Sequence, residues 1–124
     1  MLKAIILVGT GGLIGSIGRY LVQNYCSRFA PYPFPVSTFT VNIVGSLLIG
    51  IIYGLADRQN VLSQEWRLFL ATGICGGFTT FSAFAMENMT LIKQGDYATF
   101  LAYTLSSIAL GLGAVVLGVY ISKI

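Results

Sequence analysis

Four long, mostly apolar stretches follow one another along this chain of 124 residues, and only short polar segments separate them. The stretches cover residues 4–26, 36–56, 66–90 and 97–122. About twenty consecutive apolar residues are enough for a helix to cross the hydrocarbon core of a membrane. The pattern therefore predicts a single all-α domain over residues 1–124 with four transmembrane helices, and the even number of crossings puts both termini on one side.

The three predicted connections contain residues that end one helix or begin the next. The first, residues 27–35, has three prolines and cannot continue a helix. In the second, Ser63 is placed to cap the following helix, and Glu65 lies in its first turn. The third, residues 93–96, contains Gly95 for a tight turn. Connections this short leave no room for a soluble catalytic domain.

The third apolar stretch contains residues near its centre that weaken the helix predicted by its flanks. Between Gly73 and Phe84, the glycine pair Gly76 and Gly77 is followed by hydroxyl side chains, and both weaken a helix. In hydrocarbon every backbone amide needs a partner, so interrupted backbone survives only where it is packed in protein or lines a polar path. We therefore predict that the third helix is broken near its centre and that the break forms an ion site.

Phenylalanines recur every three residues across the predicted break, at Phe78, Phe81 and Phe84. The hydroxyl residues between them are Thr79, Thr80 and Ser82. A stripe of aromatic residues by itself is usually lipid-facing or core packing. Beside a break, ring edges can accept an anion, released carbonyls can accept a cation, and released amides can serve an anion. These residues alone leave the sign of the ion open.

The composition supports a membrane location and argues against several activities. Hydrophobic residues make up 56% of the chain and charged residues 9%, and the mean hydropathy is +0.82. Histidine is absent, which removes the commonest general base and metal ligand, so we expect no enzyme. The net charge of +3 comes from basic residues scattered at the predicted helix ends, as interfacial anchors are, so no nucleic-acid partner is expected.

Polar side chains form a stripe on each of two predicted helices. Asn42 and Ser46 lie one turn apart in the second helix, and Tyr103 and Ser107 lie one turn apart in the fourth. A buried Asn can simply join two helices, and the stripe alone leaves that interpretation as open as a water-lined pathway. Two facing stripes favour the pathway.

Ionisable residues are nearly absent from the predicted spans. Arg19 ends the apolar part of the first, and Glu87 follows the apolar part of the third. Charges in such places are functional candidates, and Arg19 could draw anions into a vestibule, although snorkelling to the interface also explains them. Without a carboxylate deep in the bundle, proton-coupled cation export lacks the titratable site that substrate and proton must share.

Lys and Arg are distributed so evenly between the two sides that they barely select an orientation. Chains inserted both ways up can assemble as antiparallel pairs. Because four helices enclose too little volume for a pore, at least a homodimer is expected. Small residues spaced four apart, such as Gly11 and Gly15, allow the close helix contacts that such an assembly needs.

Motifs in the first three predicted helices are similar to those of a known family. They comprise Gly11, Gly12, Gly15, Arg19 and Tyr20, then Thr40, Val41, Asn42, Gly45 and Gly50, and the run from Gly73 to Phe84. The last run is highly specific, because a glycine pair, two threonines, Phe, Ser and a second Phe follow in this order within a four-span chain of this size. On these motifs the chain resembles the CrcB, or Fluc, fluoride channels along essentially its whole length.

The resemblance implies an assembly and a function. Two antiparallel copies would form a dual-topology homodimer in the lipid of a bacterial plasma (inner) membrane, with two narrow fluoride pores. The function would be fluoride-selective, passive export of fluoride that relieves fluoride toxicity. A structural sodium ion would be held at the dimer interface by the backbone carbonyls of Gly76 and Thr79.

The resemblance also assigns residues to the ion pathway. Phe81 and Phe84 would be the pore phenylalanines, and Asn42 would hydrogen-bond fluoride. The other pathway residues would be Thr80 and Ser82 beside the break, Tyr103 and Ser107 in a polar track, and Arg19 and Glu87 toward the ends.

Two other classes of protein are alternatives. A small dual-topology multidrug or cation exporter would need a central carboxylate in its first span, and this chain has none there. A non-conducting assembly subunit would explain the glycine pairs but would leave the interrupted third helix without a use.

Overall fold

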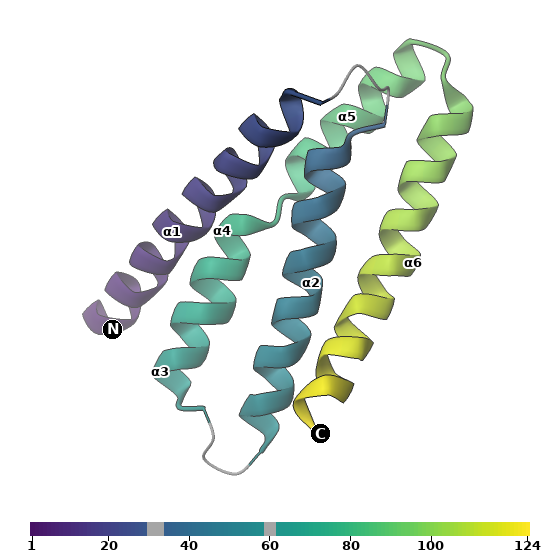
Figure 1. Ribbon diagram of the computed structural model, residues 1–124. Coiled ribbons are helices and arrows are strands. Elements are labelled where there is room, and N and C mark those ends of the chain that lie inside the picture. The colour runs from purple at the N-terminus through teal and green to yellow at the C-terminus, as the bar shows by residue number, and fades with distance from the viewer. Residues whose placement is uncertain (30–33, 59–61) are drawn as a thin grey trace.

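The computed structural model describes residues 1–29, 34–58 and 62–124, and all regular structure in these ranges is helical (Figure 1). In chain order the elements are α1 (Leu2–Ser27), α2 (Val36–Asp57), α3 (Gln64–Arg67), the π-helix η1 (Leu68–Cys75), α4 (Gly76–Phe78), α5 (Phe81–Lys93) and α6 (Tyr97–Ser122). Pro31 and Pro33, which we expect to stop the first helix from continuing, lie outside the described residues.

Four segments in the described ranges are long and apolar enough to cross a membrane. They are α1, α2, α6 and the stretch Gln64–Lys93, which contains α3, η1, α4 and α5 and is called the third segment below. The chain is therefore a multi-pass, all-α membrane protein. Figure 1 shows its two termini at the same end of the bundle, as the even number of crossings predicts.

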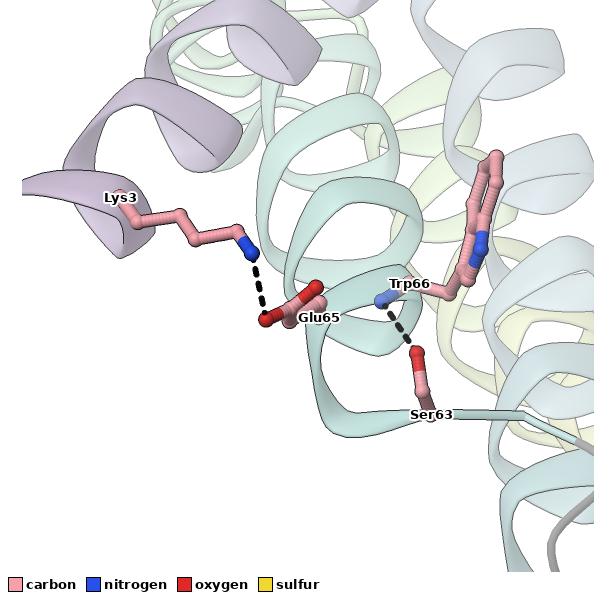
Figure 2. A network of polar contacts seen from close by, with 4 residues as sticks. All are labelled: Lys3, Ser63, Glu65 and Trp66. Carbon is pink, nitrogen blue, oxygen red and sulfur yellow. Dashed lines mark hydrogen bonds and ion pairs between the residues drawn. The ribbon is translucent and has the colours of Figure 1, made fainter.

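Local signals in the sequence set the ends of several helices. The hydroxyl oxygen of Ser63 accepts a hydrogen bond from the backbone N–H of Trp66 at 3.3 Å and so caps α3. The ammonium of Lys3 in α1 lies 2.9 Å from the carboxylate of Glu65 in the first turn of α3 (Figure 2). Gly95 adopts a φ of 74° in the turn that returns the chain from α5 to α6.

Glycines bring α1 into backbone contact with the first part of the third segment. A Cβ atom on Gly11 would lie 2.9 Å from the Cα of Gly73, and one on Gly15 would overlap the carbonyl oxygen of Ile74. A Cβ on Gly77 would lie 3.1 Å from the Cα of Gly12. The two helices touch closely because these positions lack side chains.

A second glycine contact joins α2 to α6, the pair with the most extensive packing in the bundle. A Cβ on Gly50 would lie 3.0 Å from the Cα of Val115, and a Cβ on Gly118 would lie 3.0 Å from the Cα of Gly50. The bundle is thus built from two tight pairs, α1 with η1 and α4, and α2 with α6.

The third segment changes its main neighbour along its length. Its first part, η1 and α4, packs on α1, whereas α5 packs on α6. In Figure 1, α3 and α4 lie beside α1, and α5 continues at the opposite end of the bundle, where it passes the upper end of α2 and leads to the turn before α6. The change of neighbour falls at Thr79 and Thr80.

Few side chains of the described residues are fully buried. They are Tyr103, Val41 and Thr38. Most large apolar side chains are exposed instead, along α1 and α6 above all. This distribution is what helices surrounded by hydrocarbon require, because the solvent around them is itself apolar.

Candidate functional site

Thr79 and Thr80 interrupt the helical backbone of the third segment. Thr79, at the end of α4, has φ −85° and ψ 158°, and Thr80, before α5, has φ −151° and ψ 123°. Both values are those of extended backbone. Consequently the last carbonyls of α4 and the first amides of α5 lose their partners along the helix and must be satisfied elsewhere.

The side chain of Asn42 in α2 bonds to both backbone groups of Thr80. Its amide nitrogen donates to the Thr80 carbonyl oxygen at 3.0 Å, and its Oδ1 accepts from the Thr80 N–H at 2.8 Å. This pair of bonds resembles one rung of a β-ladder, made by a side chain. Because a backbone N–H can only donate and a carbonyl can only accept, the pairing also fixes which end of the Asn42 amide is which.

The hydroxyl groups of the two threonines stabilise the ends of the interrupted helices. The Thr79 hydroxyl donates to the Cys75 carbonyl at 2.9 Å, and that carbonyl also accepts from the Thr79 N–H at 3.0 Å. The Thr80 Oγ1 accepts from the N–H of Ala83 at 3.2 Å and so caps α5. It also lies 3.3 Å from the Ser82 hydroxyl.

An open groove of about 330 Å³ lies against the interruption. Its lining comes from α2 and the third segment and consists of Asn42, Gly45, Ser46, Ile49, Ala71, Cys75, Gly76, Thr79, Thr80 and Phe81. The groove therefore contains Asn42 and, from the turn where α4 ends, Gly76, Thr79 and Thr80, and no charged side chain is among its lining residues. The wall is thus neutral and mostly apolar, and its polar groups are the hydroxyls of Ser46, Thr79 and Thr80 and the amide of Asn42. A few neutral polar groups in an apolar wall suit a partly dehydrated ion.

Aromatic rings continue from the groove into the bundle. The Phe81 ring lies 5.7 Å from that of Phe84, which in turn lies 5.0 Å from that of Tyr103. Phe34 also packs on Tyr103, in an edge-to-face arrangement with the ring centres 5.3 Å apart. Phe81 is 78% exposed, so its ring projects from a single copy of the chain, whereas Phe84 is only partly exposed.

Glu87 accepts two hydrogen bonds from different helices. The Tyr103 hydroxyl of α6 donates to its Oε1 at 2.8 Å, and the Thr38 hydroxyl of α2 donates to its Oε2 at 2.6 Å. Bonds to an ionised carboxylate are stronger than bonds between neutral groups. The carboxylate thus ties α5 to both members of the α2 and α6 pair.

Among residues 1–29, 34–58 and 62–124, three buried side-chain oxygen atoms have no hydrogen-bond partner. They belong to Ser107 and Thr104 in α6 and to the side-chain carbonyl of Asn88 in α5. Serine and threonine in a helix normally satisfy themselves on a carbonyl of the preceding turn, as Ser106 does with Ala102. Ser107 therefore retains a hydroxyl that can bond to a passing ion or water.

Arg19 lies in α1, next to a glycine that faces the end of α4. It is partly exposed, and a Cβ on its neighbour Gly18 would contact the Phe78 ring at 3.5 Å. In the described part of the chain the only ion pair joins Lys3 and Glu65, so Arg19 has no carboxylate partner there.

Comparison with known proteins decides the family. The family model described as CrcB-like protein, Camphor Resistance (CrcB), matches residues 6–119. The chain belongs to the CrcB family.

Relatives of this CrcB-family chain match it over nearly its whole length. A protein of Bacteroides fragilis is 50% identical over 125 residues, which cover 98% of both chains. A protein of Leptospira interrogans is 42% identical and covers 98% of this chain and 95% of the relative. A protein of Chlorobium luteolum is 45% identical, with coverages of 97% and 92%. All three are named fluoride-specific ion channel FluC.

The structure places the predicted site residues of this CrcB chain in two groups. Asn42 and Phe81 line the groove together with Gly76, Thr79 and Thr80. A second group, reached through Phe84, joins Tyr103 and Glu87. Ser82 contacts the first group through Thr80, while no described contact joins Arg19 or Ser107 to either group.

Sequence reasoning missed Thr38, the second donor to Glu87. The signal was present, since Thr38 precedes Asn42 by four residues and so continues the polar face of Asn42 and Ser46 by one turn. Thr40, which is prominent in the family motif, instead donates to the Val36 carbonyl of its own helix. Because Thr38 and Asn42 are four residues apart, helical spacing would have pointed to Thr38 and not to Thr40.

Proposed function

We propose that the chain is a fluoride-selective channel for passive export of fluoride across the plasma (inner) membrane of a bacterium, where it relieves fluoride toxicity. The observation that carries the proposal is the neutral groove at Thr79 and Thr80, in a chain whose relatives are named fluoride-specific ion channels. No covalent chemistry is involved, and the protein is a channel and not an enzyme.

Fluoride is small and strongly hydrated, so a pore must replace its lost water with hydrogen-bond donors. Asn42 carries two N–H donors on Nδ2, of which the Thr80 carbonyl takes one, so the second remains for an anion in the groove. The positive ring edges of Phe81 and Phe84 add weak donors beside it. Thr80 and Ser82 add hydroxyls at the start of α5, where free backbone amides and the helix dipole also favour negative charge.

The route continues, on this proposal, toward Tyr103, Ser107 and Glu87. The unpartnered Ser107 hydroxyl supports a place for it in a polar track along α6. Arg19 would attract anions from the aqueous side without entering the narrow part. The groove lining has no Lys or Arg, which suits conduction, because a fixed positive charge would hold fluoride too tightly for it to leave.

The carbonyl end of α4 is proposed to hold a structural sodium ion. Backbone carbonyls suit a hard cation, and Gly76 and Thr79, which would supply them, stand at the end of α4 and line the groove. In the described ranges there is no cluster of three His, Cys, Asp or Glu residues that would serve instead. One copy offers two carbonyls, so a second copy would supply the rest of the ligand set.

An antiparallel, dual-topology homodimer is proposed because one copy leaves the cation site incomplete. The groove is open on one side, and Phe81 at its rim is 78% exposed, although an aromatic ring at a polar site gains most when it is covered. A second, inverted copy would cover both the groove and the Phe81 ring. Its own third segment would be interrupted at the same depth, so its carbonyls would complete the cation site. Lipid would surround the remaining apolar faces of α1 and α6.

The direct test is fluoride efflux from liposomes that contain the purified protein, followed with a fluoride electrode. We expect rapid release of fluoride, while chloride-loaded liposomes release no more chloride than protein-free controls. Equal release of both anions, or release of neither, would exclude a fluoride-selective channel. A multidrug or cation exporter would show instead as proton-driven uptake of an organic cation, for which α1 provides no carboxylate.

A further inference from the structure

Asn42 of α2 bonds to the third segment where one backbone hydrogen bond of a continuing helix is missing. Helical bonding is intact as far as Thr79, whose N–H donates to the Cys75 carbonyl at 3.0 Å. The next rung of a continuing helix would run from the Thr80 N–H to the Gly76 carbonyl. That N–H points to Asn42 Oδ1 at 2.8 Å instead. Gly76 itself is helical, with φ −63° and ψ −37°, so its carbonyl is oriented for the bond that it does not receive.

We infer that Asn42 is a positioning residue that keeps Thr80 out of the helix and thereby leaves the Gly76 carbonyl open to a cation. The inference rests on the proposed sodium site and deepens it. It gives Asn42 a task separate from any contact with fluoride, because the two bonds to Thr80 use Oδ1 and one N–H and leave the other N–H for the anion.

The surroundings keep the extended residues within reach of Asn42. Thr80 is 7% exposed, so its backbone groups cannot turn to water when they lose their partner. Gly45, nearly one turn along α2, has no side chain, and a Cβ there would overlap the Thr79 methyl group. The missing side chain lets the extended residues approach α2 closely enough for Asn42 to reach them.

The consequence of removing the Asn42 amide follows from the cost of an unpaired amide in hydrocarbon. The nearest acceptor for the Thr80 N–H would be the Gly76 carbonyl, and taking it would extend α4 through Thr80. The cation would then lose a ligand. Asn42 would thus link the two ion sites, since one side chain prepares the cation ligand and donates to the anion.

The test uses the full chain with Asn42→Leu, which has nearly the same size and suits a membrane helix. Thr40→Val is the matched control, because the Thr40 hydroxyl bonds only to its own helix. Solid-state NMR of Thr80 Cα and Cβ reports whether its backbone is extended or helical. The dependence of the melting temperature on sodium, with N-methylglucamine as the replacement cation, gives the half-saturating sodium concentration.

We expect Thr80 shifts in the extended range for the native protein and the control, and in the helical range for Asn42→Leu. The half-saturating sodium concentration should rise about tenfold in Asn42→Leu, which corresponds to roughly 1.4 kcal/mol. Extended Thr80 shifts in Asn42→Leu would overturn the positioning role, whatever happens to sodium. Helical shifts with an unchanged sodium response would overturn the link to Gly76.

A measurement on the native protein covers the case in which Asn42→Leu does not fold. A through-space correlation between the Thr80 amide proton and the Asn42 side-chain carbonyl carbon is expected, and its absence would overturn the inference. Failure of the proposed function is distinguishable. If sodium does not stabilise the native protein but the correlation is present and Thr80 turns helical in Asn42→Leu, Asn42 positions Thr80 and the sodium site is wrong.

Discussion

The two parts of the third segment are held in opposite ways. The first, up to Phe78, lies against α1 through backbone contacts at glycines such as Gly11 and Gly73. The second, from Phe81 onward, is joined to α2 and α6 through side chains, chiefly Glu87 and Phe84. Glycine contacts fix where a backbone lies but offer no chemistry, whereas the side-chain contacts bring hydroxyls, a carboxylate and aromatic rings together. The first part therefore acts mainly as the scaffold and adds Ala71, Cys75 and Gly76 to the groove wall, whereas the second carries the aromatic rings and Glu87 of the candidate pathway.

The two parts of the third segment present opposite backbone groups to the interruption between them. The end of α4 presents carbonyl oxygens, and the beginning of α5 presents backbone amides, with Thr79 and Thr80 between them. A single interruption thus offers ligands to a cation and donors to an anion within two residues. A continuous helix would offer neither, since each group would be bonded within the helix.

The largest effect is expected in the scaffold. Gly15→Val should prevent α1 from reaching η1, because any Cβ at that position overlaps the Ile74 carbonyl oxygen. We expect a loss of about 3 kcal/mol of stability and little folded protein, measured by thermal unfolding and gel filtration in detergent. Gly9→Val is the control in the same helix, where nothing lies within 4 Å of a Cβ. Equal losses in both variants would contradict the scaffold role of this contact.

In the second part, loss of an aromatic ring should stop conduction without unfolding the protein. Phe81→Ile and Phe84→Ile remove the ring edges beside the groove, and fluoride efflux should fall at least about tenfold, or roughly 1.4 kcal/mol in the barrier. The proposed dimer should persist in gel filtration. Phe69→Ile, which removes a ring packed on Trp66 in the first part, should conduct as the native protein does. Native efflux from both pathway variants would remove phenylalanine from the mechanism.

A smaller effect is expected at Glu87. Glu87→Gln places an amide donor where a carboxylate accepts from both Thr38 and Tyr103, so one hydroxyl is left without its acceptor. The cost should be about 1–2 kcal/mol in thermal stability, with slower fluoride efflux. Glu65→Gln is the matched control, because its ion pair with Lys3 is exposed and worth about 0.5 kcal/mol or less. A neutral result for Glu87→Gln would show that the two bonds contribute little.

The smallest effect is expected at Thr79. Thr79→Val keeps the shape of the side chain and the backbone carbonyl and loses only the hydroxyl bond to Cys75. Because the proposed sodium ligand is the carbonyl, efflux should stay within about twofold of native, and stability should fall by about 1 kcal/mol or less. Loss of the sodium response in this variant would mean that the hydroxyl, and not the carbonyl, matters.

Much of the fold can be predicted from the sequence, because hydrocarbon imposes simple rules. The four apolar runs, the cap at Ser63 and the turn at Gly95 each depend on local chemistry and are present in the structure. Gly76 and Gly77, with the threonines after them, likewise mark the position at which the backbone becomes extended. Local residues sufficed because each of these features is decided within one or two turns.

Features that depend on contacts between helices could not be predicted from the sequence. The change of neighbour from α1 to α6 follows from how whole helices pack, and no local pattern encodes it. Thr104 and Asn88 were missed because polar residues in helices usually bond to their own backbone, so only the structure distinguishes the ones that do not. The two hydrogen bonds between Asn42 and Thr80 could not be predicted either, because they depend on the position of the Asn42 side chain in the folded bundle.

The most direct test of the central claim is an experimental structure of the protein in a lipid bilayer with sodium and fluoride present. We predict two inverted copies that cover each other's groove, extended backbone at Thr79 and Thr80 in both, and a single cation between the carbonyls of Gly76 and Thr79. A third segment that is continuous α-helix through Thr80 and faces lipid, with no cation beside it, would contradict the account.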